Sequence, residues 1–349
     1  MTASAEKILV VGPSWVGDMV MAQSLFRELV RRNANVIIDV LAPAWSEAIV
    51  NKMPEVRHAI EMPVGHGKLN LGSRYCLGRS LAKENYQRAI VLPNSLKSAL
   101  VPAFAGIPRR TGWRGEFRYG LLNDVRVLDK TAMPLMVERF VALAGQKGES
   151  LPAEILPPKL VVDIQAANDA AQKFGVDSSR KLLALCPGAE FGPAKQWPAQ
   201  HYAELAKTYL KQNWQLLLLG SANDQTVTGQ IFKTAAPGDS VLDLAGKTTL
   251  GEAVDLLSLA TAVVSNDSGL MHIAAALDRP LVAVYGATSP GFTPPLSPQA
   301  IIAQLEGVDC APCFKRDCPL QHHRCMVELE PGRIATMVDG ILTKEVDNK

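Results

Sequence analysis

The sequence predicts an α/β protein built from two doubly wound domains, each with a parallel sheet. Three observations support this prediction. The 349 residues exceed what one hydrophobic core normally holds. Short apolar runs such as LLALC and QLLLLG alternate with helical patterns along nearly the whole chain, as expected for strands covered on both faces. Hydrophobic residues make up 48% and charged residues 20% of the sequence, which excludes disordered, collagen-like and coiled-coil classes.

The elements follow in a regular order. The strands expected in the first half are Lys7–Gly12, Val36–Leu41, His58–Met62 and Arg88–Pro93. Those expected in the second half are Lys181–Pro187, Gln215–Gly220, Ser240–Leu244, Ala262–Ser265 and Leu281–Tyr285. The proline-containing stretch 148–181 separates the halves. We therefore expect an N-terminal domain over residues 1–165, a C-terminal domain over residues 166–330, and a final helix within residues 331–349. This helix has an apolar face formed by Ile334, Met337, Val338, Ile341 and Leu342.

Charge and hydropathy limit the partners of the chain. No apolar run approaches the roughly 20 residues that cross a bilayer, and the N-terminus matches a strand rather than a signal peptide, so we expect a cytoplasmic protein. Residues 1–150 carry a net charge of +7 and residues 151–349 a net charge of −5. The basic half is expected to meet an anionic partner, although solvated surface charge is the alternative. Nucleic acid is not expected, because no basic tract or RNA-binding aromatic motif is present.

The loop after the first strand runs from Gly12 to Asp18 and leads into an apolar helical pattern. It lacks the GxGxxG pattern of dinucleotide-binding dehydrogenases. It has the glycine spacing of a phosphate-binding P-loop, but Asp18 stands where the lysine would be and would repel a triphosphate. Asp18 is therefore a candidate general base near a helix N-terminus, where the helix dipole favours its ionised form. The alternative is a simple helix cap.

Three loops of the second half carry further candidates. Gly188 and Lys195 lie in the loop CPGAEFGPAKQWP, where backbone N–H groups and one ammonium can meet a phosphate; an ordinary turn with a surface lysine is the alternative. Asp224 follows another strand and can bind a ribose or cap a helix.

The segment from Ser265 to Leu277 passes from strand into helix. Asp267, Ser268 and Gly269 open that helix with free N–H groups, and His272 lies one turn further on. This arrangement suits a sugar diphosphate, although a lone histidine on an alanine-rich helix is more often structural. The chain contains no D-x-D triplet, the carboxylate pair by which many glycosyltransferases hold a metal-bound diphosphate. The loops therefore predict a design without a catalytic metal.

These motifs together resemble the ADP-heptose family of bacterial lipopolysaccharide heptosyltransferases, glycosyltransferase family 9. The resemblance is carried by GPSWVGDMVMAQSL from Gly12, MPEV from Met53, the long segment VLPNSLKSALVPAFAGIPRRTGWRGEFRYGLLNDVRVLD from Val91, PLMVERF from Pro134, CPGAEFGPAKQWP from Cys186 and SNDSGLMHIAAAL from Ser265. It extends over the chain to about Pro295, and it is closest to the members that add a heptose to the first heptose of the inner core.

The resemblance implies a GT-B fold, two Rossmann-like domains facing across a cleft, and an inverting transfer of heptose from ADP-heptose to heptosyl-Kdo2-lipid A. It implies that Asp18 is the catalytic base. The implied donor-binding residues are Ser14, Gly188, Lys195, Asp224, Asp267, Ser268, Gly269 and His272. No cofactor is required, and a divalent cation at most assists product release. The final helix is expected to pack back on the N-terminal domain. The alternatives are a heptosyltransferase acting on Kdo and a two-lobed nucleotide-sugar-binding protein without catalysis.

A basic segment of the first half is the candidate acceptor site. Guanidinium groups suit the Kdo carboxylates and lipid A phosphates of the implied acceptor, and aromatic faces suit sugar rings. The residues proposed for it are Lys97, Arg109, Arg110, Trp113, Arg114 and Arg118. Partly solvated surface charge is the alternative. Because the acceptor is a lipid, we expect peripheral association with the cytoplasmic face of the inner membrane.

Four of the six cysteines cluster outside the motifs of the resemblance. They are Cys310, Cys313, Cys318 and Cys325, with two histidines in the last gap. The C-x2-C spacing is compatible with a structural metal site, with reduced thiols and with a redox-linked disulfide. The family chemistry does not require a metal there.

Overall fold

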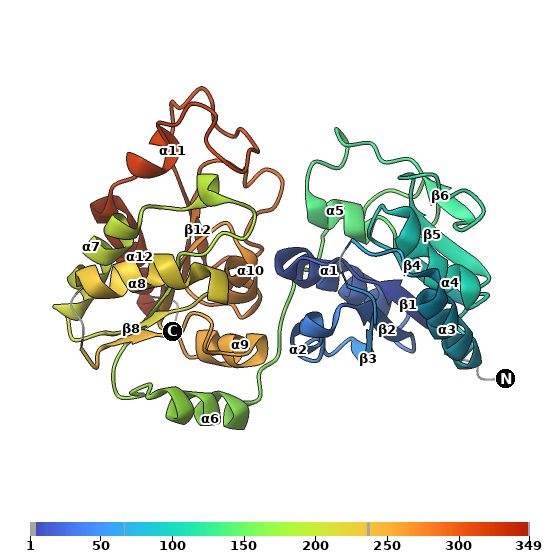
Figure 1. Cartoon of the computed structure of the whole chain (residues 1–349), viewed down its shortest axis with the longest axis horizontal. Helices are drawn as coiled ribbons and strands as arrows, with labels where there is room; N and C mark the ends of the chain where they lie inside the picture. Colours follow the sequence, from blue (N-terminus) through green and yellow to red (C-terminus); the bar gives the residue numbers. More distant parts are fainter. Residues whose placement is uncertain (1–4, 66, 236–237, 348–349) are drawn as a thin grey trace. The chain divides into compact units, whose positions relative to one another are not determined.

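The computed structural model describes residues 5–65, 67–235 and 238–347 and divides the chain into two compact units, Met1–Leu160 and Val161–Lys349 (Figure 1). The first unit contains strands β1 (Lys7–Val11), β2 (Ile37–Ala42), β3 (Val56–Glu61), β4 (Arg88–Val91), β5 (Arg109–Trp113) and β6 (Asp124–Arg126). Its α-helices are α1 (Val16–Arg32), α2 (Glu47–Val50), α3 (Leu71–Leu81), α4 (Leu100–Phe104) and α5 (Met136–Val141).

The second unit repeats this plan. Its strands are β7 (Leu182–Cys186), β8 (Gln215–Leu218), β9 (Val241–Asp243), β10 (Ala262–Asn266), β11 (Leu281–Tyr285) and β12 (Ala300–Gln304). Its α-helices are α6 (Ile164–Phe174), α7 (Ala199–Leu210), α8 (Gln225–Ala235), α9 (Leu250–Ser258), α10 (Gly269–Ala276), α11 (Arg324–Val327) and α12 (Pro331–Asp347). Short 3-10 turns precede several helices, among them η3 (Leu96–Ala99), η4 (Pro193–Lys195) and η5 (Ala222–Asp224).

Both sheets are parallel and share one topology. The orders are β3-β2-β1-β4-β5-β6 and β12-β11-β10-β7-β8-β9. In each sheet the first three strands run in order from the centre to one edge. The chain then crosses back to the centre, and the last three strands run in order to the other edge. The central pairs are β1 with β4, where Val11 faces Val91, and β7 with β10, where Cys186 faces Ser265. This confirms the two doubly wound α/β domains predicted from the apolar runs. In such sheets ligands bind beyond the carboxyl ends of the strands where the order reverses.

The central strands are buried because helices cover both faces of each sheet. All five residues of β7 and all five of β10 are buried, which explains their unbroken apolar sequences. In the second unit, α7 packs against α8 and α12 on one face, whereas α9 packs against α6 and α10 on the other (Figure 1). In the first unit, α1 pairs with α5 and α3 with α4. The covered sheets place the loops after β1, β4, β7 and β10 on rigid supports.

The structure differs from the sequence expectations at three strands, at one domain boundary and in the placement of the last helix. Strands β5, β6 and β12 were not predicted, because their sequences RRTGW, DVR and AIIAQ are short and two of them are largely polar. The first unit ends at Leu160, close to the expected boundary at residue 165. The last helix begins at Pro331, as predicted, but its apolar face lies within the second unit.

Helix α12 belongs to the core of the second unit. Ile334, Val338 and Ile341 are buried in the same apolar cluster as Leu183 and Val282 of the second sheet. The helix contacts α7, β10, β11 and β12. The apolar face of α12, which was predicted to cover the first domain, is therefore occupied by the helix's own unit.

Candidate functional site

The loops after β7 and β10 meet where the strand order of the second sheet reverses. Lys195 ends the 3-10 turn η4, and its Nζ lies 2.7 Å from Asp267 Oδ2 and 3.2 Å from the Asp267 carbonyl oxygen. Thr288, in the loop after β11, donates its hydroxyl to the same Oδ2 at 2.6 Å. Asp267 is 4% exposed. The two charged residues predicted separately from the sequence thus form one ion pair, in which Asp267 is buried and Lys195 partly buried.

Asn266 holds the two loops together and was not among the predicted site residues. Its Nδ2 donates to the carbonyl of Pro187 at 2.6 Å, and its Oδ1 accepts from the backbone N–H of Trp197 at 3.2 Å. The Tyr202 hydroxyl also donates to this Oδ1, at 3.0 Å. The side chain is fully buried, so its hydrogen bonds are needed to offset the cost of burial. In the sequence, Asn266 directly follows the apolar run AVVS. An amide side chain at the end of a strand expected to be buried is the signal that could have indicated this role.

Ser268 and Gly269 lie at the start of α10, as predicted. Ser268 is the N-cap residue in extended conformation, and its Oγ lies 3.2 Å from Ser265 Oγ. The first N–H groups of this eight-residue helix have no partner within the helix, which makes its N-terminus suited to an anion.

Gly188 and Asp224 are in direct contact. A Cβ on Gly188 would lie 2.6 Å from the Asp224 carboxylate, so a larger residue would require the Asp224 side chain to move. Asp224 Oδ2 accepts from the backbone N–H and the hydroxyl of Ser221, both at 2.8 Å. This is a capping arrangement at η5, so the helix-capping interpretation holds for one oxygen of Asp224.

His272 lies in α10 and is 5% exposed. Burial lowers its pKa to about 4, and Lys195 acts in the same direction, while the carboxylate of Asp267 opposes it. The imidazole is therefore neutral at physiological pH. The charges of Lys195 and Asp267 both act on the pKa of His272, so the histidine lies close to this ion pair.

The depressed pKa of His272 predicts a pH-dependent stability. Between its ordinary pKa and about 4, the unfolded chain binds a proton that the folded chain does not, so the free energy of unfolding falls as the pH drops below about 6.5. From about pH 7.5 to about pH 5 we expect His272 to account for a loss of about 2 kcal/mol. Urea unfolding at pH 7.5 and pH 5 measures this loss. In His272→Gln the free energy of unfolding should fall by about 2 kcal/mol less between the two pH values, whereas the exposed His58→Gln should lose as much as the unsubstituted protein. Equal slopes in all three proteins would contradict the prediction.

In the first unit, Asp18 lies in the first turn of α1, three residues after the N-cap residue Trp15. Ser14 and Asp18 are both partly exposed, and both follow β1, which pairs with β4 where the first sheet reverses. Asp18 follows β1 and Lys195 follows β7. These two strands occupy the same position in the strand order of their sheets.

Several predicted acceptor residues support the fold of the first unit. Arg118 is 2% exposed and donates to the carbonyls of Pro93 at 2.6 Å and Trp113 at 2.7 Å, and burial lowers its pKa to about 10. Trp113 is also buried, and its Nε1 donates to the Arg139 carbonyl at 3.0 Å.

The other members of that set differ in exposure. Arg109 pairs with Asp124, and Arg110 donates to the carbonyl of Leu121. Lys97 is partly exposed and Arg114 is exposed. Arg114 therefore keeps its charge on the surface, and Phe117 and Tyr119, a few residues further along the chain, form an exposed aromatic pair.

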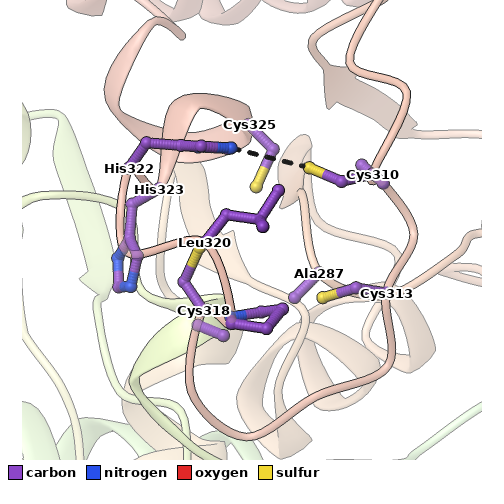
Figure 2. Close-up of a pocket in the computed structure, with 11 residues that line it drawn as sticks. Ala287, Cys310, Cys313, Cys318, Leu320, His322, His323 and Cys325 are labelled. Atoms are coloured by element: carbon purple, nitrogen blue, oxygen red, sulfur yellow. Dashed lines mark hydrogen bonds between the residues drawn. The ribbon is translucent and has the colours of Figure 1, made fainter.

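The four clustered cysteines line one small cavity in the loop between β12 and α11 (Figure 2). All four are free thiols, and as the side chains lie, no three His, Cys, Asp or Glu residues within the described ranges are placed to hold a metal ion. Cys186 is buried in β7, and Cys76 is exposed.

Comparison with known proteins gives consistent matches. The family model described as "Glycosyltransferase family 9 (heptosyltransferase)" matches residues 74–324. The chain is 51% identical to lipopolysaccharide heptosyltransferase 2 of Escherichia coli strain K12, covering 97% of this chain and 99% of that protein. It is 48% identical to lipooligosaccharide heptosyltransferase 2 of Haemophilus influenzae, covering 97% and 99%. The solved structure of E. coli ADP-heptose lps heptosyltransferase II matches with a TM-score of 0.88 at 49% identity, covering 97% and 99% of the two chains.

Proposed function

Because the chain belongs to glycosyltransferase family 9, the heptosyltransferases, we propose that it transfers heptose from ADP-heptose to the first heptose of the lipopolysaccharide inner core. The chain is an enzyme, a glycosyltransferase. The observation that carries the choice of substrates is the similarity, over nearly its full length, to proteins named for this transfer. The acceptor would be heptosyl-Kdo2-lipid A.

The second unit would hold the donor. Lys195 supplies the positive charge for the diphosphate, and the N-terminus of α10 supplies free N–H groups beside it. Before the donor binds, Asp267 offsets the charge of Lys195, so the diphosphate would share or displace this carboxylate. Gly188 lies against the Asp224 carboxylate and is a proposed donor contact through its backbone. Ser14, Asp224 and His272 complete the proposed donor contacts.

The first unit would hold the acceptor and the base. Asp18 would take the proton of the acceptor hydroxyl as its oxygen bonds to the anomeric carbon, while the bond from that carbon to ADP breaks and ADP leaves with the electron pair. Inversion at the anomeric carbon follows from this single displacement. Lys97, Arg109, Arg110 and Arg114 are the candidates for binding the anionic acceptor, and Trp113 and Arg118 would shape that surface from within.

A direct assay separates this proposal from its alternatives. The protein is incubated with ADP-heptose and heptosyl-Kdo2-lipid A, and the lipid is analysed by mass spectrometry. The proposal requires a product one heptose heavier and an equivalent release of ADP. Transfer to Kdo2-lipid A alone would identify the Kdo-acting alternative. Binding of ADP-heptose without transfer to any core acceptor would identify a binding protein.

The lipid anchor of the proposed acceptor would bring the reaction to a membrane surface. In the part of the chain that the structure describes, no helix is both long and apolar enough to cross a bilayer. We propose peripheral association with the cytoplasmic face of the inner membrane, supported by the net charge of +7 in residues 1–150. Nucleic acid has no place in this proposal.

Transfer is expected to proceed without an added metal ion. The donor site offers Lys195 and a helix N-terminus as its positive groups, and the chain has no D-x-D triplet. Initial rates should therefore persist in EDTA, with at most a modest stimulation by Mg²⁺ through faster release of ADP. A complete loss in EDTA that Mg²⁺ or Mn²⁺ restores would contradict this prediction and would point to a metal at the diphosphate.

A further inference from the structure

Residues 93–98, called the β4 loop below, follow one of the two central strands at which the order of the first sheet reverses. The backbone N–H of Leu92 donates to the Val11 carbonyl at 3.1 Å, so the β4 loop and the loop that leads to Asp18 leave the sheet from neighbouring strands. In a doubly wound sheet, ligands bind in the crevice between two such loops. With Asp18 as the base, the acceptor hydroxyl would therefore lie beside the β4 loop.

Arg118, which lies between β5 and β6, is buried against the first half of the β4 loop. Its Nη1 donates to the Pro93 carbonyl at 2.6 Å, and its Nη2 donates to Asn94 Oδ1 at 3.1 Å and to the Trp113 carbonyl at 2.7 Å. Gly115 allows the two loops to approach closely, since a Cβ there would lie 2.4 Å from the Asn94 carbonyl oxygen. The guanidinium thus joins the β4 loop to the end of β5.

Arg74, in α3, holds the second half of the β4 loop. It is 4% exposed, and its Nη1 donates to the Lys97 carbonyl at 3.3 Å. Its Nε donates to the Leu69 carbonyl at 2.6 Å, and its Nη2 donates to the Lys68 carbonyl at 3.3 Å. Arg74 therefore ties Lys97, a proposed acceptor residue, to the segment that precedes α3.

The two guanidinium groups are buried without a carboxylate partner. Among the described residues, every oxygen that accepts from Arg74 or Arg118 is a neutral carbonyl, amide or hydroxyl oxygen. Burial lowers the pKa of both groups, that of Arg118 to about 10, where the charge of Glu116 opposes the shift. An apolar side chain would fill the same space without the cost of burying a charge. Only a guanidinium can donate to several separate acceptors in a fixed geometry, so fixing the loop explains why arginines stand there.

We propose that Arg74 and Arg118 are positioning residues that hold the β4 loop in the conformation that binds the acceptor. The loop offers the exposed amide of Asn94 and the partly exposed side chains of Ser95 and Lys97. Amide, hydroxyl and ammonium groups suit the hydroxyls and anionic groups of the acceptor sugars. This inference rests on the proposed function, and it gives the buried Arg118 a role through the loop in place of direct contact with the acceptor.

The test compares three arginine-to-lysine variants by steady-state kinetics with ADP-heptose and heptosyl-Kdo2-lipid A. Lysine keeps the positive charge but cannot donate to the same set of carbonyls. Arg74→Lys and Arg118→Lys should each raise the KM for the acceptor at least about tenfold and change the KM for ADP-heptose less than about twofold.

Arg88→Lys is the matched control. Arg88 is also buried, it donates to the carbonyls of Leu143 and Ala144, and burial lowers its pKa to about 10. It lies at the amino end of β4, away from the β4 loop. Arg88→Lys should therefore lower the melting temperature and leave the KM for both substrates unchanged. An acceptor KM that is unchanged in Arg74→Lys and Arg118→Lys, while the unsubstituted protein forms product, would overturn this inference alone.

A second measurement uses the unsubstituted protein and applies if the variants do not fold. Heptosyl-Kdo2-lipid A in detergent micelles should slow amide hydrogen exchange in residues 94–98 at least about fivefold relative to empty micelles. Residues 142–145, which Arg88 contacts, should exchange at the same rate in both samples. Unchanged exchange in residues 94–98 would overturn the inference. Absence of transfer by the unsubstituted protein would refute the proposed function and this inference with it.

Discussion

Asp18→Asn is expected to reduce kcat by about 10²–10⁴ while leaving the affinity for ADP-heptose almost unchanged. The substitution keeps the size of the side chain and removes its basicity, so the acceptor hydroxyl would have to lose its proton without help. The reason for choosing Asp18 is its position in the first turn of α1, directly after the central strand β1. The helix dipole at this position favours the ionised carboxylate that a base requires.

The control for Asp18 is Asp163→Asn, which changes a carboxylate at the start of α6 that accepts a hydrogen bond from the Gln165 N–H. This variant should lose some stability and keep its kcat. Donor affinity is measured by calorimetry with ADP-heptose, and turnover by release of ADP. If Asp18→Asn keeps its turnover and only unfolds at a lower temperature, Asp18 stabilises the helix and the base lies elsewhere.

Lys195→Ala is expected to cost about 2–4 kcal/mol in kcat/KM, divided between weaker donor binding and slower departure of ADP. In the proposed mechanism, this ammonium neutralises the charge that grows on the diphosphate as the bond to the sugar breaks. Lys195→Arg should recover only part of the loss, because a planar guanidinium cannot occupy the position of a point charge 2.7 Å from Asp267 Oδ2. Lys207→Ala, an exposed lysine in α7, should behave as the unsubstituted enzyme.

The ion pair complicates the interpretation of Lys195→Ala, and a double variant resolves it. Removing the lysine leaves the Asp267 carboxylate buried without its cation, so stability should fall as well. Lys195→Ala/Asp267→Asn removes both charges and should restore much of the melting temperature without restoring kcat/KM. If the double variant regained kcat/KM together with stability, Lys195 would serve the fold and not the diphosphate.

The sequence predicted the central strands and the loops after them, because fully buried parallel strands are unbroken apolar runs and loops follow them directly. It did not predict β5 and β6, where Arg109 and Arg126 alternate with small or polar residues. The same segment was interpreted as an acceptor surface, whereas Arg118 within it is buried on carbonyl oxygens. A sequence shows the type of a charged side chain but not whether a backbone turn surrounds it.

The candidate site residues were proposed from the sequence one by one, and their arrangement was not. Lys195 and Asp267 are separated by more than one strand and helix, so their contact depends on the pairing of β7 with β10. Asn266 and Thr288 were missed for the same reason, since their hydrogen bonds reach loops that are distant in the sequence. The packing of α12 on the second unit could not be predicted from the sequence either. Its apolar periodicity shows that the helix has a buried face but does not show which core covers that face.

The shared strand order of the two sheets has an evolutionary consequence. Each half of the chain carries its own reversal of strand order, and the loop after its first strand carries a candidate site charge, the carboxylate of Asp18 in one half and the ammonium of Lys195 in the other. Each loop depends on the core of its own half, so substitutions that retarget one half do not disturb the other. We therefore expect family members to diverge in the molecule they modify while keeping the same activated sugar, with sequence change concentrated in the first 160 residues.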